Sequence, residues 1–538
     1  MACGLLRAAA GLPSLQQVQD YTKQAKRAKT AGIQVETVHE LRQWAYGHAL
    51  PHRKEDLEPH KVYAVPIDYS SFPNIEAICL TSDRQIGWIM QLNRCPVYYV
   101  FHIDGKHKLH HGKWMLITIG VHVLALSLKK QIVHQFRPLV YQFVKQQESA
   151  LGSAMLCTAV NTVSTMYGGQ PLLPAVLTSD RSTGFRSGCL SVWSNAGWAN
   201  CWPHLCTKLE SGKAGVSKSH PMFEKLCGQF RSLRAAQSVA MFQRMVHELG
   251  KLPGWKDNEF NTLWNSYLLA DEGWDHWFLG AFPKVPACIQ NNNVIEIWHE
   301  HGVMNVLRNI SGAMKGSTEF VLEHTMSALL TLDGVRMPEL LNFSVPVEWI
   351  PVGVYEAARK IVLDPRRIRI VGTSLGLEDN RAAGLTIYVL SNHCTKFNKI
   401  DDSLIAKYEA ALRGERPARV KSWDSYISIC SSVYKLEVAA DIKSLIPCRA
   451  NFYKLLCPCY SGRHRGICSH IAGATHTLMR RFLEDRNLEF NVKYRLMRLC
   501  APRRAHRPRK PRGARVVEDS SDEEEDEQAR QEEEARSW

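Results

Sequence analysis

The feature that most constrains the fold is a succession of apolar, β-branched segments between residues 97 and 180. The stretch VYYVFHID (97–104) is followed by WMLITIGVHVLAL (114–126) and RPLVYQFV (137–144), and each has the composition of a buried strand. A helical segment at about 148–167 comes next, and a fourth strand, PAVLTSD, then ends on Asp180. This order predicts an α/β domain built around a mixed sheet.

Two of these predicted strands deliver a carboxylate at their ends. Asp104 and Asp180 each come directly after an apolar run, where an unpaired buried charge is costly. If the two strands are parallel neighbours, their ends lie about 5 Å apart and the carboxylates converge. A divalent cation would relieve the repulsion, and hard oxygen ligands favour Mg²⁺ or Mn²⁺. The alternative is that Asp104 begins a turn and that Asp180 caps a helix.

A site with two metal ions needs a further acidic ligand, and the segment NNNVIEIWHEHGVMNVLRNI (291–310) offers two. The segment is typical of a helix, and its asparagines are placed to cap the start. Glu296 is the first candidate, and Glu300, one turn along the same face, competes with it. Residues 189–289, before this helix, are rich in tryptophan and follow the three-and-four spacing of amphipathic helices, which predicts a helical insertion.

The order of these elements resembles the ribonuclease-H-like core of the Mutator-like element (MULE) transposases. FHIDGKHKL is similar to the first aspartate motif of that family, and AVLTSDRSTGF is similar to the second. NNNVIEIWHEHGVMNVL looks like the segment that carries its glutamate. The resemblance covers roughly residues 60–310, and it implies that Asp104, Asp180 and Glu296 are a catalytic triad that holds Mg²⁺ or Mn²⁺.

The insertion opens with NCWPHL, which resembles the Cys-x-x-His signature of the family and so implies a functional role for Cys201 and His204. We expect a structural or DNA-positioning role, because two ligands alone do not hold zinc. The alternative is that both are core residues beside Trp198 and Trp202.

The chain also departs from the family pattern. Lys106 and His107 follow the glycine of the first motif, where the family usually has a small or hydroxyl residue. Residues 1–90 contain no Cys/His cluster, although members commonly carry a separate zinc-dependent DNA-binding domain there. These departures predict a truncated or domesticated relative.

A second cluster, CPCYSGRHRGICSH, places Cys457, Cys459, Cys468 and His470 in two close pairs. Four such ligands can close tetrahedrally around Zn²⁺, and a site with four protein ligands is structural. The pattern resembles the SWIM zinc finger, which commonly follows a MULE core. The alternatives are a chance group of thiols, or a site that uses the nearby Cys448, His464 or His476. Its basic side chains, Arg463, Arg465 and Lys454, suit phosphate contact, but the finger could equally bind protein.

Charge and apolar content bound the class of protein. The formal charge of +15 favours an anionic partner such as nucleic acid, although it also promotes solubility. The longest apolar run, at 114–128, is too short to span a bilayer, and the first residues do not resemble a secretory signal. We therefore expect a cytosolic or nuclear protein whose cysteines are thiols or metal ligands.

We predict five regions. Residues 1–92 form a helical and strand region whose basic helix at 15–32 either contacts phosphates or is simply solvated. The core spans 93–310, a mixed region with a strand pair at IRIVG and LTIYVLS spans 311–440, and the finger spans 441–482. Residues 500–538 are basic and then acidic, which predicts a disordered tail with a nuclear import signal and phosphorylation sites.

The resemblance implies a DDE-type DNA transposase, or a protein derived from one, that cuts and joins DNA with two metal ions. We expect it to act in the nucleus as a homo-oligomer on terminal inverted repeats and target DNA, with DNA affinity that falls with salt. The alternative is a domesticated, catalytically inactive transcriptional regulator that binds DNA. An RNA-cleaving nuclease on the same fold is a third reading.

Overall fold

The computed structural model describes residues 38–59, 61–72, 75–94, 100–106, 114–126, 132–145, 149–211, 217–255, 264–268, 276–283, 285, 291–304, 352–371, 386–438, 455–465 and 468–485. The predicted basic helix at 15–32 and the predicted tail at 500–538 lie outside these ranges.

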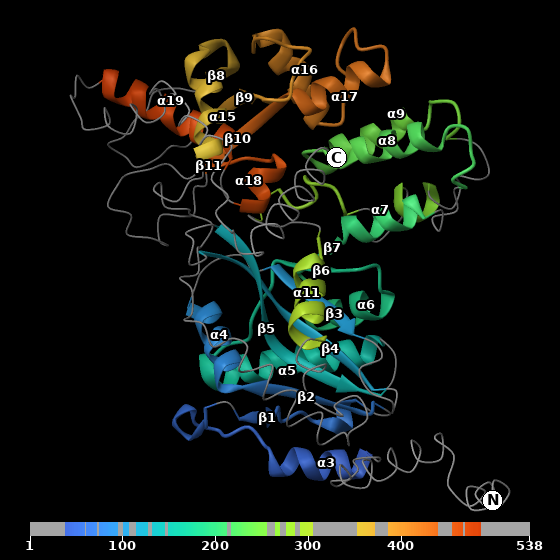
Figure 1. The fold of residues 1–538 in the computed structure, drawn as a ribbon, viewed down its shortest axis with the longest axis vertical. Helices are drawn as coiled ribbons and strands as arrows, with labels where there is room; N and C mark the ends of the chain where they lie inside the picture. The colour runs from blue at the N-terminus through green and yellow to red at the C-terminus, as the bar shows by residue number, and fades with distance from the viewer. Residues whose placement is uncertain are drawn as a thin grey trace, which may run out of the picture. The chain divides into compact units, whose positions relative to one another are not determined.

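A seven-stranded sheet organises the first part of the chain (Figure 1). Its strands follow the order β1-β2-β5-β4-β3-β6-β7. Their bounds are β1 (Val62–Ala64), β2 (Ala77–Ser82), β3 (Val100–Lys106), β4 (Met115–Leu126), β5 (Ile132–Val144), β6 (Val176–Ser179) and β7 (Gly197–Asn200). The pairs β3–β6 and β6–β7 are parallel, and the other neighbours are antiparallel. The prediction of a mixed α/β sheet is confirmed.

Helices cover both faces of this sheet, as the alternation along β3 requires. Phe101 and Ile103 point into a core with α4 (Asp83–Arg94), α5 (Ala150–Gly168) and α6 (Thr183–Val192). His102 and Asp104 point to the opposite face, where they contact the segment formed by α11 (Asn293–Ile297) and the π-helical turn η6 (Trp298–Val303). Helix α3 (Val38–Gly47) packs on β1 and β2 in a core that also includes Val303.

Three sequence-based boundaries differ from the structure. The strand that carries Asp104 continues through Lys106, so Asp104 lies within β3 rather than after it. Strands β1 and β2 belong to the same sheet as β3, and the boundary predicted at residue 92 therefore falls inside one sheet. Residues 197–200, which we predicted as part of a helical insertion, instead form edge strand β7 beside β6. Its sequence, GWAN, lacks the β-branched residues that marked the equally short β6.

The insertion proper follows β7 and shares a hydrophobic core with helices near the end of the chain. Its helices are α7 (Trp202–Glu210), α8 (Phe223–Leu233) and α9 (Val239–Leu249), and the later helices are α16 (Asp402–Leu412) and α17 (Trp423–Ser432). Gln237 joins the two parts, because its amide nitrogen donates to the carbonyls of Cys430 and Val433 at 2.9 Å each.

A second sheet has the order β11-β10-β9-β8 and is antiparallel throughout. Its strands are β8 (Ile368–Val371), β9 (Thr386–Leu390), β10 (Val433–Val438) and β11 (Leu455–Leu456), so the predicted strand pair in the mixed region is confirmed. Helices α15 (Val352–Leu363), α18 (Tyr460–Arg465) and α19 (Ser469–Asp485) accompany it. The short helical turns are η2 (Lys54–Asp56), η3 (Tyr69–Ser71), η5 (Trp264–Leu268) and η9 (Pro365–Arg367).

Within the described ranges, every helix is too short or too polar to cross a lipid bilayer.

Glycine permits the close approach of α5 and α6. A Cβ at Gly188 would lie 2.1 Å from the carbonyl oxygen of Ala150, whereas one at Gly228 on the exposed side of α8 would meet nothing within 4 Å. We expect Gly188→Ala to lower the free energy of unfolding by about 1–3 kcal/mol through overpacking. Gly228→Ala, the matched control, should raise it by about 0.5–1 kcal/mol because alanine favours the helix. Urea unfolding measures both, and equal midpoints would contradict the close contact.

Candidate functional site

The parallel pairing of β3 with β6 brings the first two predicted acids to one edge of the sheet. The register pairs Phe101 with Leu177 and His102 with Thr178, so the chain reaches Asp104 and Asp180 at the same level. Asp180 directly follows β6, and Ser179 donates to its Oδ1 at 3.1 Å. Asp104 and Asp180 therefore lie at the same level of two parallel neighbouring strands, as a convergence of their carboxylates requires.

Glu296 joins them from α11, which packs across β3. Burial raises the pKa of the Asp180 carboxyl, and the negative charge of Asp104 raises it further. Burial also raises the pKa of Glu296; His204 opposes the shift, whereas Asp104 and Asp180 add to it. Asp104 and Asp180 thus act electrostatically on Glu296, so the three predicted acids lie in one region of the described structure. Among the described residues, however, these three acids do not form a group whose possible ligand atoms all lie within 4.8 Å of one another.

Both oxygens of Asp104 already have partners. Its Oδ1 accepts the amide of Gly105 at 2.9 Å, and its Oδ2 lies 3.3 Å from Nδ1 of His299. The other ring nitrogen of His299 lies 3.0 Å from Oγ1 of Thr118, which is the cross-strand neighbour of Asp104. His299 is buried, and our sequence analysis missed it. Its spacing of three from Glu296 on one helix face was the signal that could have found it.

Glu300, the predicted competitor of Glu296, is engaged elsewhere. Its Oε2 lies 3.1 Å from Nζ of Lys106, and its side chain is half exposed. Lys106, which departs from the family motif, therefore pairs with Glu300. Glu296 is the acid of this helix that faces His204 and interacts with the two aspartates.

The asparagines before α11 act differently from the predicted caps. Asn292 occupies the N-cap position but makes no side-chain capping bond. Its side-chain Oδ1 lies 3.1 Å from Nδ1 of the buried His102, and its backbone amide donates to Sγ of Cys201 at 3.2 Å. Asn291 supplies a local bond instead, because its Oδ1 accepts the amide of Asn293 at 2.8 Å. Tertiary partners on β3 and at the start of α7 thus compete with the local cap.

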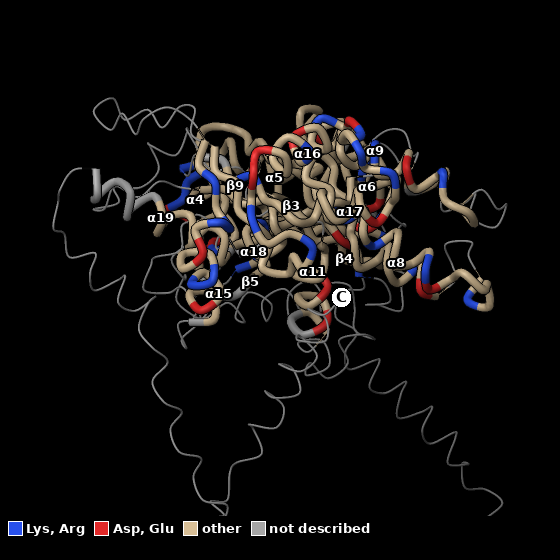
Figure 2. Tube along the Cα trace, turned by 90° about the horizontal axis from the view of Figure 1, so that it is seen from above, with Lys and Arg blue, Asp and Glu red and all other residues tan. Residues whose placement is uncertain are grey.

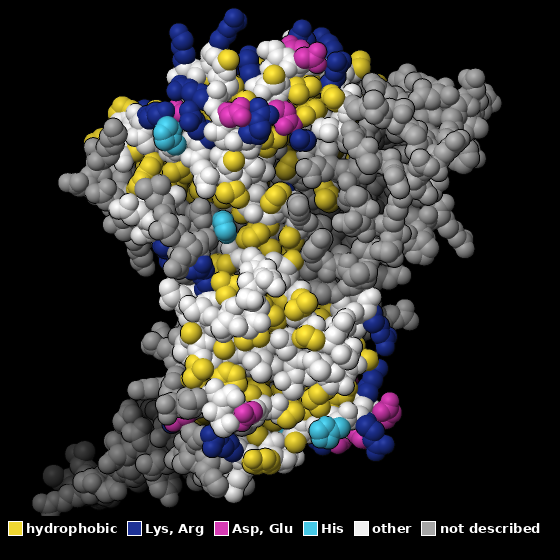
Figure 3. Space-filling model, turned by 180° about the vertical axis from the view of Figure 1, so that it is seen from behind, with side chains coloured by type: hydrophobic (Ala, Val, Ile, Leu, Met, Phe, Trp, Pro, Cys, Tyr) yellow, Lys and Arg dark blue, Asp and Glu magenta, His cyan; other side chains and the backbone are white. Residues whose placement is uncertain are grey.

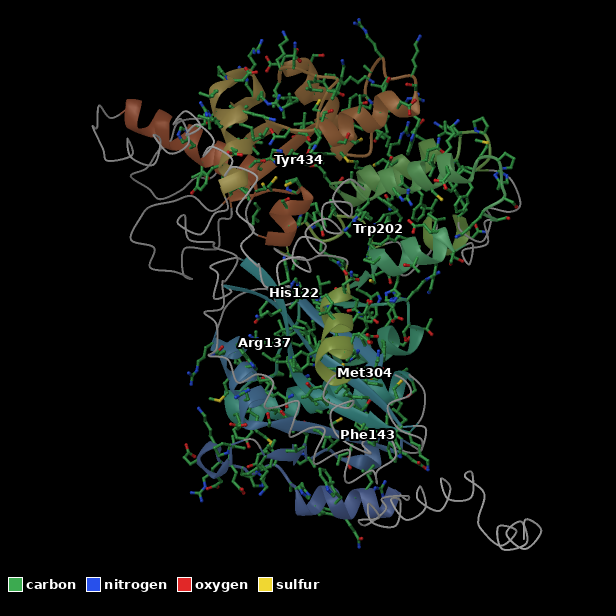
Figure 4. The ribbon with its side chains drawn as sticks, in the orientation of Figure 1. His122, Arg137, Phe143, Trp202, Met304 and Tyr434 are labelled. Atoms are coloured by element: carbon green, nitrogen blue, oxygen red, sulfur yellow. The ribbon has the colours of Figure 1, made fainter. Side chains whose placement is uncertain are left out.

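The Cys-x-x-His pair, Cys201 and His204, lies beside Glu296 and is not only part of the hydrophobic core. Cys201 is the N-cap residue of α7, its amide donates to the carbonyl of Ser179 at 3.0 Å, and burial raises the pKa of its thiol to about 12. Nδ1 of His204 lies 3.4 Å from Oε1 of Glu296. Trp202, between them, packs into the core of the insertion, where Figure 4 places it at the beginning of α7.

A small pocket adjoins the acidic cluster. Its polar lining comes from the loop after β6, the end of β7 and helix α7, with Trp277 at its apolar side. The lining residues are Arg181, Asn200, Cys201, His204, Leu205, Lys208 and Trp277. The positive charge of Lys208 lowers the pKa of Asp180, so a cationic side chain lies within electrostatic range of the carboxylates.

The predicted finger ligands form a closed cluster beside β11. One ligand atom from each of Cys457, Cys459, Cys468 and His470 lies within 4.8 Å of the others, and all four residues are buried. Sγ of Cys457 and Nδ1 of His470 are 3.8 Å apart. Ligands bound at 2.0–2.3 Å to one tetrahedral zinc ion are separated by roughly 3.5–3.8 Å, so this geometry fits Zn²⁺.

The surroundings of these sulfur atoms suit thiolates. The amide of Gly462 donates to Sγ of Cys459 at 3.2 Å, and the amide of Ile471 donates to Sγ of Cys468 at 3.4 Å. Burial raises the pKa of the Cys457 and Cys468 thiols, whereas contacts with the neighbouring cysteines lower the pKa of Cys459. A bound cation would offset the cost of burying such charges. The ring of Tyr434 on β10 lies 4.6 Å from that of His470 (Figure 4).

The finger arginine that we predicted for phosphate contact has another role. Arg463 is buried, and its Nη1 donates to the carbonyls of Phe282, Pro283 and Val285 at 3.0, 2.9 and 3.3 Å. A second cation, Arg234, lies 5.0 Å from the ring centre of Trp202 and 5.1 Å from that of Tyr460. Through Arg463 and Tyr460, helix α18 therefore contacts residues of the insertion.

Of the other predicted finger candidates, His476 is described and is not part of the ligand cluster. Cys448, Lys454 and the side chains of His464 and Arg465 lie outside the described part of the structure. His476 is buried on α19.

Comparison with known proteins gives no relative: no protein-family model and no curated protein matches the chain.

The finger should bind one zinc ion per chain, and Cys457→Ser should lose that ion because three ligands no longer close the site. The finger region should then melt at a lower temperature, since metal affinity contributes directly to its folding. Elemental analysis and thermal melts with and without a chelator measure both effects. The control is Cys394→Ser, which changes a partly buried thiol outside the cluster. Equal zinc content in Cys457→Ser and wild type would contradict the site.

Arg463→Ala should leave the zinc ion in place and lower the free energy of unfolding by about 2–4 kcal/mol, because three carbonyls lose a charged donor that is itself buried. Arg413→Ala is the matched control, since that arginine pairs with Glu415 at the surface and should contribute little. Zinc content and denaturation curves separate the two roles. Loss of zinc in Arg463→Ala would show that the residue supports the metal site itself.

Proposed function

We propose that the chain is a nuclease of the DDE transposase type, or a protein derived from one, with a ribonuclease-H-like core. The observation that carries this proposal is the placement of Asp104, Asp180 and Glu296 in one region, by two parallel neighbouring strands and a helix packed on β3. Carboxylates gathered in this way bind Mg²⁺ or Mn²⁺, which would polarise a phosphodiester and activate a water molecule.

The element order supports the same proposal. Strand β3 with Asp104, strands β4 and β5, helix α5, strand β6 with Asp180, a helical insertion and the helix with Glu296 follow one another as in the MULE resemblance. The two additional strands β1 and β2 extend the sheet on the far side of β5. The finger that follows the core fits the resemblance to a SWIM-type module.

The side chains around the acids have distinct tasks in this proposal. Asp104 and Asp180 would hold the cations from neighbouring strands of the sheet. Glu296 would supply the third carboxylate from α11, which packs on β3. His299 orients Asp104, since it lies between that carboxylate and the buried hydroxyl of Thr118. Lys208, in the adjoining pocket, is placed to contact a phosphate.

DNA is the proposed polymer, with the nucleus as the site of action. Lys and Arg residues lie along much of the described trace, interspersed with acids (Figure 2). They gather over the end of the molecule that carries α15 and α16 (Figure 3). Several of these are paired, as Arg366 is with Asp364 and Arg369 with Asp402. Backbone contacts by such residues would make DNA affinity fall with salt.

The partners of Asp104 favour a second candidate, a DNA-binding regulator without cleavage activity. Nδ1 of His299 lies 3.3 Å from Oδ2 of Asp104 and so occupies a position from which a metal ion would bind that oxygen. In that case the acids stay together, and the protein binds DNA without cutting it.

Nicking of supercoiled DNA by the purified full-length chain in Mg²⁺ or Mn²⁺ tests the choice. We expect Asp104→Asn and Asp180→Asn to lower the nicking rate at least about 100-fold, because each removes a charged metal ligand. The control is Asp424→Asn, an exposed acid in the first turn of α17. Nicking that survives in the first two variants would overturn the proposed centre. Salt-dependent DNA binding without nicking by wild type would establish the regulator.

A further inference from the structure

The contact between α7 and α11 collects three chemically different ligand atoms. Cys201 and His204 come from the first turn of α7, and Glu296 comes from α11. One sulfur, one imidazole nitrogen and one carboxylate oxygen from these residues lie within 4.8 Å of one another. A hydrogen bond from the backbone amide of Asn292 to Sγ of Cys201 joins the two segments there, although these residues are 91 positions apart in the chain.

Two of these atoms are buried without a satisfied hydrogen bond. Nδ1 of His204 and Oε1 of Glu296 are shielded from solvent, and neither has a hydrogen-bond partner in the described structure. They nevertheless face each other at 3.4 Å. Nitrogen and oxygen ligands bound at about 2.0–2.1 Å to one tetrahedral ion lie roughly 3.3 Å apart. The separation therefore suits two ligands that share an ion.

The sulfur of Cys201 has the surroundings of the finger ligands. In the finger, Cys459 and Cys468 each accept the amide of the residue three positions later. Sγ of Cys201 likewise accepts a backbone amide, that of Asn292, at 3.2 Å. Such amide donors stabilise a thiolate when a metal ion binds it.

We propose that Cys201, His204 and Glu296 form a binding site for a transition metal ion of the Zn²⁺ or Co²⁺ class. Sulfur and imidazole ligands select such ions over Mg²⁺, which the aspartates prefer. Three protein ligands leave a fourth position open, in contrast to the closed finger. The pocket lined by Asn200 and Lys208 adjoins this position, so water or a phosphate oxygen can occupy it.

The metal site itself does not depend on DNA cleavage, but its consequence rests on the proposed function. Zinc bound by Glu296 would withdraw one of the three carboxylates from the Mg²⁺ centre. Micromolar Zn²⁺ should therefore inhibit Mg²⁺-dependent nicking by the wild type.

Cobalt binding to the purified full chain that holds one equivalent of zinc, which the closed four-ligand finger retains, tests the site without reference to activity. Co²⁺ bound to a thiolate has a charge-transfer absorption in the near ultraviolet, and we expect about one equivalent to produce it. Cys201→Ser should abolish this band, and His204→Ala should weaken Co²⁺ binding roughly tenfold or more. The matched control is Cys206→Ser, which alters another thiol of α7 outside the cluster.

The Cys457→Ser variant distinguishes cobalt bound at the α7 site from cobalt that has replaced zinc in the finger. The proposal expects the cobalt band to persist there, because that finger lacks a ligand while the α7 site is intact. A band lost in Cys457→Ser but retained in Cys201→Ser would place all the cobalt in the finger and overturn the proposal. The absence of any band in wild type would also overturn it. His204→Ala keeps the test valid if Cys201→Ser does not fold, because its side chain is partly exposed.

The outcomes also distinguish this site from the proposed nuclease. A cobalt band in a protein that never nicks DNA would support the site and count against the nuclease. Nicking that Zn²⁺ does not inhibit, together with the absence of a cobalt band, would support the nuclease and count against the α7 metal site.

Discussion

The parallel pairing of β3 with β6 is the constraint on which the rest of the site depends. Three residue pairs, from Val100 with Val176 to His102 with Thr178, fix the register of the two strands. A shift by one residue would turn His102 and Asp104 into the apolar layer and Phe101 out of it, because side chains alternate along a strand. The apolar cost of such a slip holds Asp104 on the face where α11 supplies Glu296. A hydrophobic pattern thus determines the position of a charged group.

The same pattern explains how much the sequence could predict. The apolar run at 114–126 predicted β4 closely, and the run at 137–144 predicted the second part of β5, which begins at Ile132, because long strands carry a strong compositional signal. The four ligands of the finger were also evident, since their short spacing limits what they can form. By contrast, β7 and the contacts of His299 and Arg463 depend on residues far apart in the chain. Local periodicity carries no information about such contacts.

The finger and the acidic cluster are parts of one connected arrangement in the described structure. Arg463 binds the carbonyls of Phe282, Pro283 and Val285, which precede α11 in the chain. Phe282 also packs against Gly197 of β7, where a side chain larger than hydrogen would clash. Tyr460 lies over Arg234, which lies over Trp202, the neighbour of Cys201. Loss of the finger fold would therefore remove contacts from both ends of the insertion.

This arrangement separates two kinds of metal chemistry by the hardness of the ligands. The aspartates offer only oxygen, whereas the finger offers three sulfur atoms and one nitrogen. Glu296 lies between the aspartates and the softer ligands of α7, because it interacts electrostatically with Asp104 and Asp180 and faces His204 at 3.4 Å. A carboxylate in that position can serve either set of partners, and its charged form is most stable where the nearest charge is positive. The aspartates repel it, and His204 attracts it. In the absence of cations, the electrostatics therefore favour the side of α7, and only a bound divalent ion reverses that preference.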